Sequence, residues 1–187
     1  MTDFYSDHYS ADVGSTGHFT TLLTVPKSIG VGKKHSRVRR TAAFATVPSG
    51  QDLADDDVVR LLDLKSDARL LELRFSMDAN WGATTDFNIG LYLKGSDNAG
   101  AVVDEDLFAA AQDWSGAIAR SDLLTSGTLD DHDRGKMLWE MVNAVTASTY
   151  TVDPQVMYTV ALTASSDNSA AAAAVEFLCE AFYVAGD

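Results

Sequence analysis

The chain of 187 residues fits one domain with an extension, and a domain of this size needs no disulfide staples because it buries roughly 70% of its unfolded surface. Its net charge of −13 divides into +3 for residues 1–50 (six basic, three acidic) and −16 for residues 51–187 (eight basic, 24 acidic), and an acidic body disfavours nucleic acid. No segment approaches the ~20 apolar residues of a membrane span, and the N-terminus lacks a signal peptide, so we expect no membrane contact and synthesis in a cytoplasm.

Residues 1–36 are predicted to be an extended N-terminal arm, because they are rich in Ser, Thr, Gly and Asp and contain only scattered aromatic residues. Such a segment is too polar to collapse alone, and its aromatic side chains would anchor it as it orders on a partner. A plainly disordered tail has the same composition. A short strand is expected at 19–25. The candidate anchors are Phe4, Tyr5, Tyr9 and Phe19.

A basic cluster, KKHSRVRR, leads into the body of the chain. It could dock on an acidic protein surface or a phosphate backbone, or it could be a solvated strand edge, since edge strands often carry cations. We take it, with the aromatic anchors, as a candidate partner-binding site. The basic residues are Lys33, Lys34, Arg37, Arg39 and Arg40.

Residues 37–187 are predicted to form one β-sandwich domain. Residues 37–47 begin it as a strand with Val38, Ala42 and Phe44 on one face, and Arg40 interrupts that face, which favours a sheet edge. Further strands are expected at 57–64, 69–77, 85–94, 156–164 and 175–184, the last packed on both faces.

Apolar side chains alternate with polar ones along two of these strands, which indicates one buried and one solvated face. The expected buried faces are Leu71, Leu73, Phe75 and Met77, then Phe87, Ile89, Leu91 and Leu93. The only cysteine, Cys179, lies in the apolar run VEFLCEAFYV and is expected to be a buried, inert thiol.

Two segments have a helical period. Residues 104–114 predict a short helix with Asp104 as N-cap, and residues 136–145 fit either a strand or a helix, of which we favour the helix. Residues 115–135 are expected to be an acidic loop. The sum is an all-β fold, an antiparallel β-sandwich or jelly roll with one or two short inserted helices.

No catalytic motif, metal-binding motif or cofactor motif is evident, so we predict no enzyme, no metal and no cofactor. The acidic triplets do not match the spacing of a calcium loop, and the histidines lack metal-ligand spacing. A pair of catalytic carboxylates of the kind that glycosidases use remains an alternative, because four glutamates lie on predicted strands or helices. The residues concerned are His8, His18, His35, His132, Asp55–Asp57, Asp130, Asp131, Asp133, Glu72, Glu140, Glu176 and Glu180.

The order of motifs resembles the decoration or cement proteins of tailed-phage heads over about residues 33–165. A basic strand leads, an "L-x-L-x-x-x-A-R-L-L" strand pair follows, then "F-x-I-G-L-Y" and an acidic "D-x-D-L-F-x-x-A" segment. The residues concerned are His35, Arg37, Arg39, Leu62, Leu64, Ala68, Arg69, Leu71, Phe87, Ile89, Gly90, Leu91, Tyr92, Asp104, Asp106, Leu107, Phe108 and Ala111.

The resemblance implies a virion protein on the capsid surface that binds the major capsid protein and bridges its subunits, and it supplies no catalytic residues. We expect a homotrimer or homodimer. One alternative is a carbohydrate-binding β-sandwich that stacks sugars on Trp81 in a loop between strands, although Trp81, Trp114 and Trp139 equally suit a core or an interface. Another is a metal-dependent jelly-roll enzyme.

Overall fold

The computed structural model describes residues 11–13, 19–22, 38–47, 49–50, 55–79, 86–94, 100–113, 116–125, 129, 133, 135–146, 149–165 and 174–185. The chain divides into two units, one built on residues 1–36 and one on residues 37–186. In the first unit, the short strands β1 (Ala11–Val13) and β2 (Phe19–Leu22) pair antiparallel.

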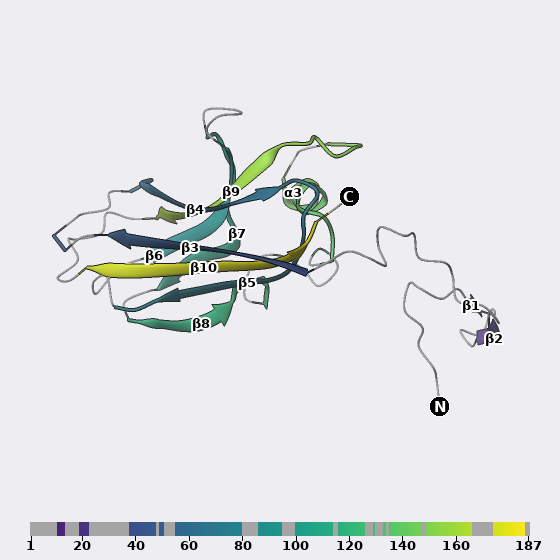
Figure 1. Cartoon of the computed structure of the whole chain (residues 1–187). Coiled ribbons are helices and arrows are strands. Elements are labelled where there is room, and N and C mark those ends of the chain that lie inside the picture. Colours follow the sequence, from purple (N-terminus) through teal and green to yellow (C-terminus); the bar gives the residue numbers. More distant parts are fainter. Residues whose placement is uncertain are drawn as a thin grey trace. The chain divides into compact units, whose positions relative to one another are not determined.

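The described part of the second unit, which we call the body, is built of two antiparallel four-stranded sheets (Figure 1). The first sheet has the strand order β3-β10-β5-β8 and the second has the order β4-β9-β6-β7. The strands are β3 (Val38–Val47), β4 (Val58–Lys65), β5 (Arg69–Met77), β6 (Asp86–Leu93), β7 (Val102–Asp113), β8 (Ile118–Asp122), β9 (Met157–Ala164) and β10 (Val175–Val184).

The pairing of the body strands is nested. The first strand of the body pairs with the last, β4 pairs with β9, β5 with β8, and β6 with β7, all antiparallel. Two further pairings, β10 with β5 and β9 with β6, join these ribbons into the two sheets. A long hairpin rolled up in this way is the jelly-roll arrangement. The prediction of an antiparallel all-β sandwich is therefore confirmed.

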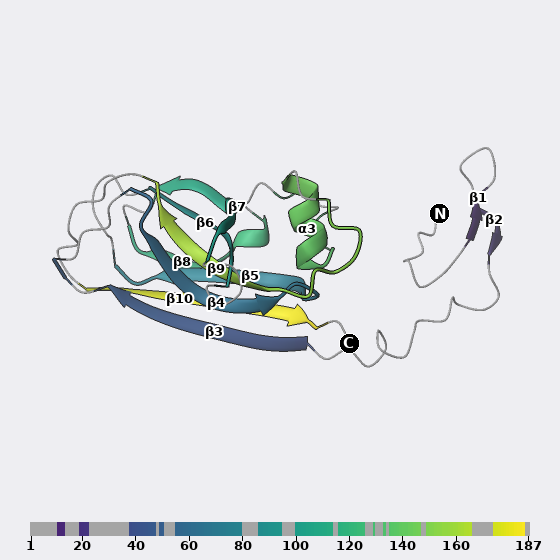
Figure 2. The same cartoon turned by 90° about the horizontal axis from the view of Figure 1, so that it is seen from above.

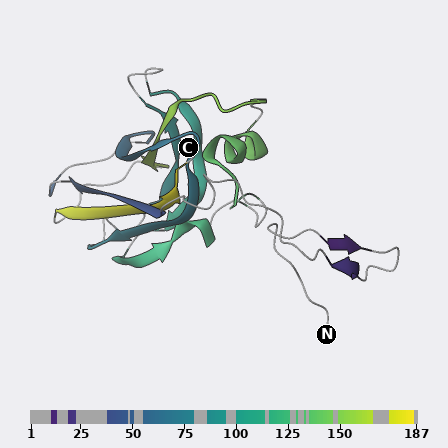
Figure 3. The ribbon, with the colours of Figure 1, turned by 45° about the vertical axis from the view of Figure 1, so that its right-hand side comes forward.

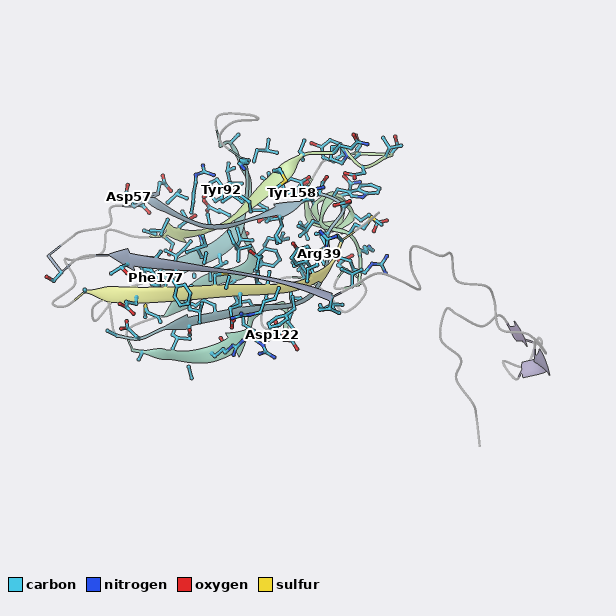
Figure 4. The ribbon with its side chains drawn as sticks, viewed as in Figure 1. Arg39, Asp57, Tyr92, Asp122, Tyr158 and Phe177 are labelled. Carbon is cyan, nitrogen blue, oxygen red and sulfur yellow. The ribbon has the colours of Figure 1, made fainter. Side chains whose placement is uncertain are left out.

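The core lies between the two sheets and includes contacts between aromatic rings. Phe177 of β10 lies 5.9 Å from Phe75 of β5 and 6.5 Å from Phe87 of the second sheet, measured between ring centroids. Phe177 is labelled on β10 in Figure 4. Cys179 of β10 is also fully buried, and this burial raises the pKa of its thiol to about 12. The buried thiol is confirmed.

The strand predicted at 69–77 matches β5, but its buried face changes phase at Leu71. On β10, Tyr183 and Phe182 are adjacent, yet they pair with Leu70 and Glu72 of β5, so Leu71 is the extra residue of a β-bulge. Leu70 is buried in the core and Leu71 is exposed. The expectation that Leu71 is buried is therefore wrong, because a period of two does not survive an inserted residue.

Strands β6 and β9 are buried on both faces, whereas the sequence predicted one solvated face for residues 85–94. Asn88 and Tyr92 of β6 and Thr159 and Thr163 of β9 lie on the face away from the core and are nonetheless buried. Their polar atoms are paired: the hydroxyl groups of Tyr92 and Thr163 lie 2.7 Å apart, and Thr159 donates to Asp63 at 2.7 Å.

Residues 104–114 do not form the predicted helix; residues 102–113 are the edge strand β7. Ile89 and Leu91 are two positions apart on β6, but they pair with Ala109 and Asp104, five positions apart on β7. This wide bulge turns the consecutive residues Leu107 and Phe108 inward, and both are fully buried. A helix and a bulged strand both bury neighbouring apolar residues, which explains the wrong prediction.

The bulge of β7 lies directly against Gly90 of β6. A Cβ atom at Gly90 would lie 2.1 Å from the carbonyl oxygen of Asp104 and 2.3 Å from the carbonyl carbon of Glu105. Only glycine allows this close approach of two backbones. The glycine of the "F-x-I-G-L-Y" motif therefore has a structural role.

The region predicted as an acidic loop, residues 115–135, contains strand β8 and a 3-10 turn, η1 (Leu123–Thr125). The short helix favoured for 136–145 is confirmed as α3 (Leu138–Val145). Its first turn is capped by Glu140, whose carboxylate accepts from the backbone N–H of Met137 at 2.8 Å. The backbone N–H groups of Leu138 and Trp139, at the start of α3, donate to the carbonyls of Ala68 and Ser66. Figure 3 shows α3 at one end of the sandwich.

Candidate interaction surface

Charged side chains of opposite sign pair with one another on the outer face of the first sheet. Strand register places Arg40, Phe182 and Glu72 in one row across β3, β10 and β5. The next row contains Ala42, Glu180 and Arg74, and Asp122 of β8 continues it. The third row is Phe44, Leu178 and Ser76. We call these three rows the outer face.

A buried carboxylate lies at the centre of the outer face. Glu180 has a side chain only 2% exposed, and it is held between Arg40 of β3 and Arg120 of β8. The Nε of Arg40 donates to Oε1 of Glu180 at 2.9 Å, its Nη2 donates to the same oxygen, and Arg120 forms an ion pair with Oε2. Desolvating a carboxylate costs several kcal/mol unless charged donors compensate, so the two arginines stabilise this arrangement.

A second ion pair, between an arginine and a glutamate, lies beside Glu180 on the same face. Arg74 of β5 lies 2.6 Å from Oε2 of Glu72, and its guanidinium lies 5.1 Å from the centroid of the Phe182 ring. Each of these side chains is held by a partner on the same or a neighbouring strand. This paired part of the outer face is therefore an ordered surface of arginine, glutamate and aromatic groups, which would lose little side-chain entropy on binding.

One margin of the outer face is apolar and exposed. Phe44 of β3 is 77% exposed, and Val38 of the same strand is also exposed. Ala43 and Ala45 of β3 pack against the core instead. The face of Val38, Ala42 and Phe44 that the sequence picked out is therefore the solvent face, and the expected position of this strand at a sheet edge is confirmed.

The second sheet presents a different surface, the acidic bulge of β7. Burial, and then the neighbouring carboxylates of Asp106 and Glu105, raise the pKa of Asp104 to about 6. The side chain of Asn88 fixes the far side of the bulge by accepting from the N–H of Ala111 at 2.7 Å, where the backbone has a φ of +39°.

The structure describes only two of the predicted partner-binding side chains. Arg39 is exposed near the start of β3 (Figure 4), whereas Arg40 is bound to Glu180 and so is partly neutralised. The side chain of Phe19, in β2, and the residues Lys33, Lys34, Arg37, Phe4, Tyr5 and Tyr9 lie outside the described part of the chain. Their partner-binding role stays a prediction.

The sequence analysis named Glu180 but did not predict that it is buried among arginines, and it did not single out Arg74 or Arg120. The signal was a glutamate in the middle of an apolar closing strand, VEFLCEAFYV, which requires cationic partners if it is buried. Their identity depends on which strands flank β10, and no local pattern fixes that pairing.

The other candidate sites can be followed only in part. Trp81, Trp114 and the four histidines lie outside the described residues, whereas Trp139 is half-buried in α3. Among the glutamates, Glu140 caps α3 and Glu176 is exposed.

Within the described ranges, no group of three or more His, Cys, Asp or Glu side chains is arranged to hold a metal ion. Asp55–Asp57 are exposed, and Asp133 pairs with Lys136 at 2.5 Å. No helix in the described ranges is long and apolar enough to cross a membrane.

No protein-family model and no curated protein matches the chain. Among solved structures, a chain of the cyanophage Pam1 capsid asymmetric unit is 14% identical with a TM-score of 0.43, and the match covers 88% of this chain and 94% of that one. A chain of the capsid of Ralstonia phage GP4 is 18% identical with a TM-score of 0.50, over 89% of this chain and 92% of that one. This protein thus shares its fold with a chain of the Ralstonia phage GP4 capsid.

Proposed function

We propose that this protein is a non-enzymatic structural protein of a phage virion, which binds the outer surface of the capsid and stabilises it by bridging major capsid protein subunits. The observation on which this rests is the fold shared with the chain from the Ralstonia phage GP4 capsid, which extends over about nine-tenths of both chains. The sequence resemblance to decoration and cement proteins points in the same direction.

The physical properties of the body suit such a role. The paired arginines and glutamates of the outer face are already ordered, so little conformational entropy is lost when a large surface docks on them. An oligomer that engages several equivalent capsid sites at once gains avidity without further contacts. The net charge of −16 on residues 51–187 also keeps crowded particles from associating.

We propose a docking role for four of the five cations of the basic cluster. Because Arg40 is bound to Glu180, the cations that we propose for contact with an acidic capsid surface are Arg39 and the three that precede β3, namely Lys33, Lys34 and Arg37. Contacts of this kind are weakened by salt, since exposed charges are screened within about 8 Å at physiological ionic strength.

The test is fractionation of purified virions, followed by measurement of the temperature at which particles release their genome. We expect the protein in the particles, and we expect particles stripped of it to release the genome at a lower temperature that added protein restores. The variant Arg39→Glu should bind stripped particles less tightly than the control variant Val102→Glu, which changes an exposed side chain on β7. Absence from virions, or unchanged heat resistance after stripping, would refute the proposal.

A further inference from the structure

The described body has four strands at sheet edges, and three of them are protected against pairing with another chain. β4 carries Arg60, Asp63 and Lys65, and β8 is only five residues long. β7 combines its wide bulge with three consecutive acidic residues, 104–106. Charges, short length and bulges are the usual features that prevent edge-to-edge association.

The fourth edge, β3, lacks this protection over most of its length. It runs for ten residues and pairs with β10 through an unbroken register (Figure 2). Its only charges are Arg39 and Arg40 at one end, and the stretch Thr41–Val47 contains neither a charge nor a proline. The uncharged and unbulged stretch Thr41–Val47 leaves a row of backbone N–H and C=O groups available to another strand.

We propose that β3 pairs antiparallel with β3 of a second copy of this chain, about a two-fold axis near Ala42–Phe44. The result is a continuous eight-stranded sheet made of the first sheets of two bodies. A two-fold contact uses the same patch on both copies, so the patch must be self-complementary.

The uncharged stretch meets this requirement. In an antiparallel pair about an axis at residue 43, Phe44 of one copy lies opposite Ala42 of the other, and the two Phe44 rings become diagonal neighbours on the outer face. Arg40 then lies opposite Thr46, about six residues along the strand from the second Arg40, or roughly 20 Å at 3.3 Å per residue. That separation exceeds the screening length of about 8 Å, so the arginines do not oppose pairing.

The outer face supplies an apolar surface for the exposed ring. Phe44 lies in the same row as Leu178 of β10, which is half-buried, and in the proposed pair each Phe44 ring has the small side chain of the other copy's Ala42 opposite it. Pairing would remove two strongly exposed phenylalanines from water. The stretch Thr41–Val47 offers no cation to an acidic segment of another protein, whereas its uncharged residues match a second copy of themselves, so the occupant that fits is a second copy of this chain.

The experiment is sedimentation of the full chain as wild type, Phe44→Lys and Val102→Lys. Both substitutions replace an exposed side chain on an edge strand, 77% and 57% exposed respectively. We expect the wild type and the Val102 variant to dimerise and the Phe44 variant to be weakened about tenfold or more, because it places two lysines near the axis. Association of the wild type should persist at high salt, unlike contacts through exposed charges.

A cross-linking measurement identifies the surface directly. Cys179 is fully buried, so a short bis-maleimide should join two copies of Ala42→Cys while leaving the wild type unlinked. A monomeric wild type, equal behaviour of the two lysine variants, or cross-linking from Val102→Cys instead would overturn the inference. Capture of β3 by capsid particles while the free chain stays monomeric would also overturn it. The inference is independent of the capsid proposal, since sedimentation and cross-linking both use the isolated protein.

Discussion

Strands β3 and β7 are both long and both lie at the edge of a four-stranded sheet, but only β7 has features that prevent pairing with another strand. β7 bends through a wide bulge and presents three consecutive acidic residues, whereas β3 is regular and presents an exposed phenylalanine. Burial, and then the neighbouring carboxylates of Asp106 and Glu105, raise the pKa of Asp104, so an ionised Asp104 in the bulge has a free-energy cost. The comparison indicates that an open edge is a feature of β3 rather than a general property of this body.

The largest expected effect comes from preventing the bulge of β7. Gly90→Ala places a Cβ atom 2.1 Å from the backbone oxygen of Asp104, which the two strands cannot accommodate without separating. We expect a loss of about 3 kcal/mol in the free energy of unfolding, measured by urea denaturation. Gly116→Ala is the control, because a Cβ there meets no atom within 4 Å. Equal stability of the two variants would show that the strands do not approach as described.

An intermediate loss in the free energy of unfolding is expected when the ion pair between β3 and β10 is removed. Arg40→Ala leaves the buried Glu180 with Arg120 as its remaining cationic partner, and we expect a loss of about 2 kcal/mol. Arg39→Ala, one residue away and exposed, should change the free energy by less than about 0.5 kcal/mol.

A double variant separates the charge from the packing at this site. Arg40→Ala combined with Glu180→Met should be more stable than Arg40→Ala alone, since the uncompensated charge is gone. If the double variant is the less stable of the two, Arg40 does not act by balancing Glu180.

The smallest effect concerns the acidic groups of β7. Because folding raises the pKa of Asp104 from 3.8 to about 6, the folded state binds its proton more tightly. The contribution of Asp104 to stability is therefore full below about pH 4 and is lost as the pH rises through 6. Asp104→Asn should match the wild type at pH 4 and be about 1 kcal/mol more stable at pH 7, after a discount for solvent screening. Thermal unfolding at both pH values measures this, and no gain at pH 7 would contradict it.

The alternating patterns located most strands of the body, because burial of one face imposes a period of two on any sequence. They failed where the backbone departs from regular pairing. Leu71 is exposed by a bulge, and residues 104–113 form a bulged strand instead of a helix, since inserted residues shift the phase of the pattern. β8 was missed because its five residues, IARSD, have no buried face of their own.

The candidate site was less accessible to prediction than the fold. Glu180 lies in an apolar strand, which indicates that it is buried and needs cationic partners. Those partners, Arg40 and Arg120, come from other strands, and the sequence does not predict that these strands lie beside β10. Arg40 was assigned to a basic cluster for the same reason: its neighbours in the chain are cations, whereas its neighbour in space is a carboxylate.

The nested pairing of the body has a consequence for synthesis of the chain. Arg40 and Glu180 meet on adjacent strands although they are 140 residues apart, and β10, which follows the other described strands in the chain, lies inside the first sheet between β3 and β5. The first sheet therefore cannot assemble until β10 has been translated, and contacts between such distant residues form slowly. Until then both sides of β3 are open, so nascent chains on neighbouring ribosomes are at risk of premature association through this strand.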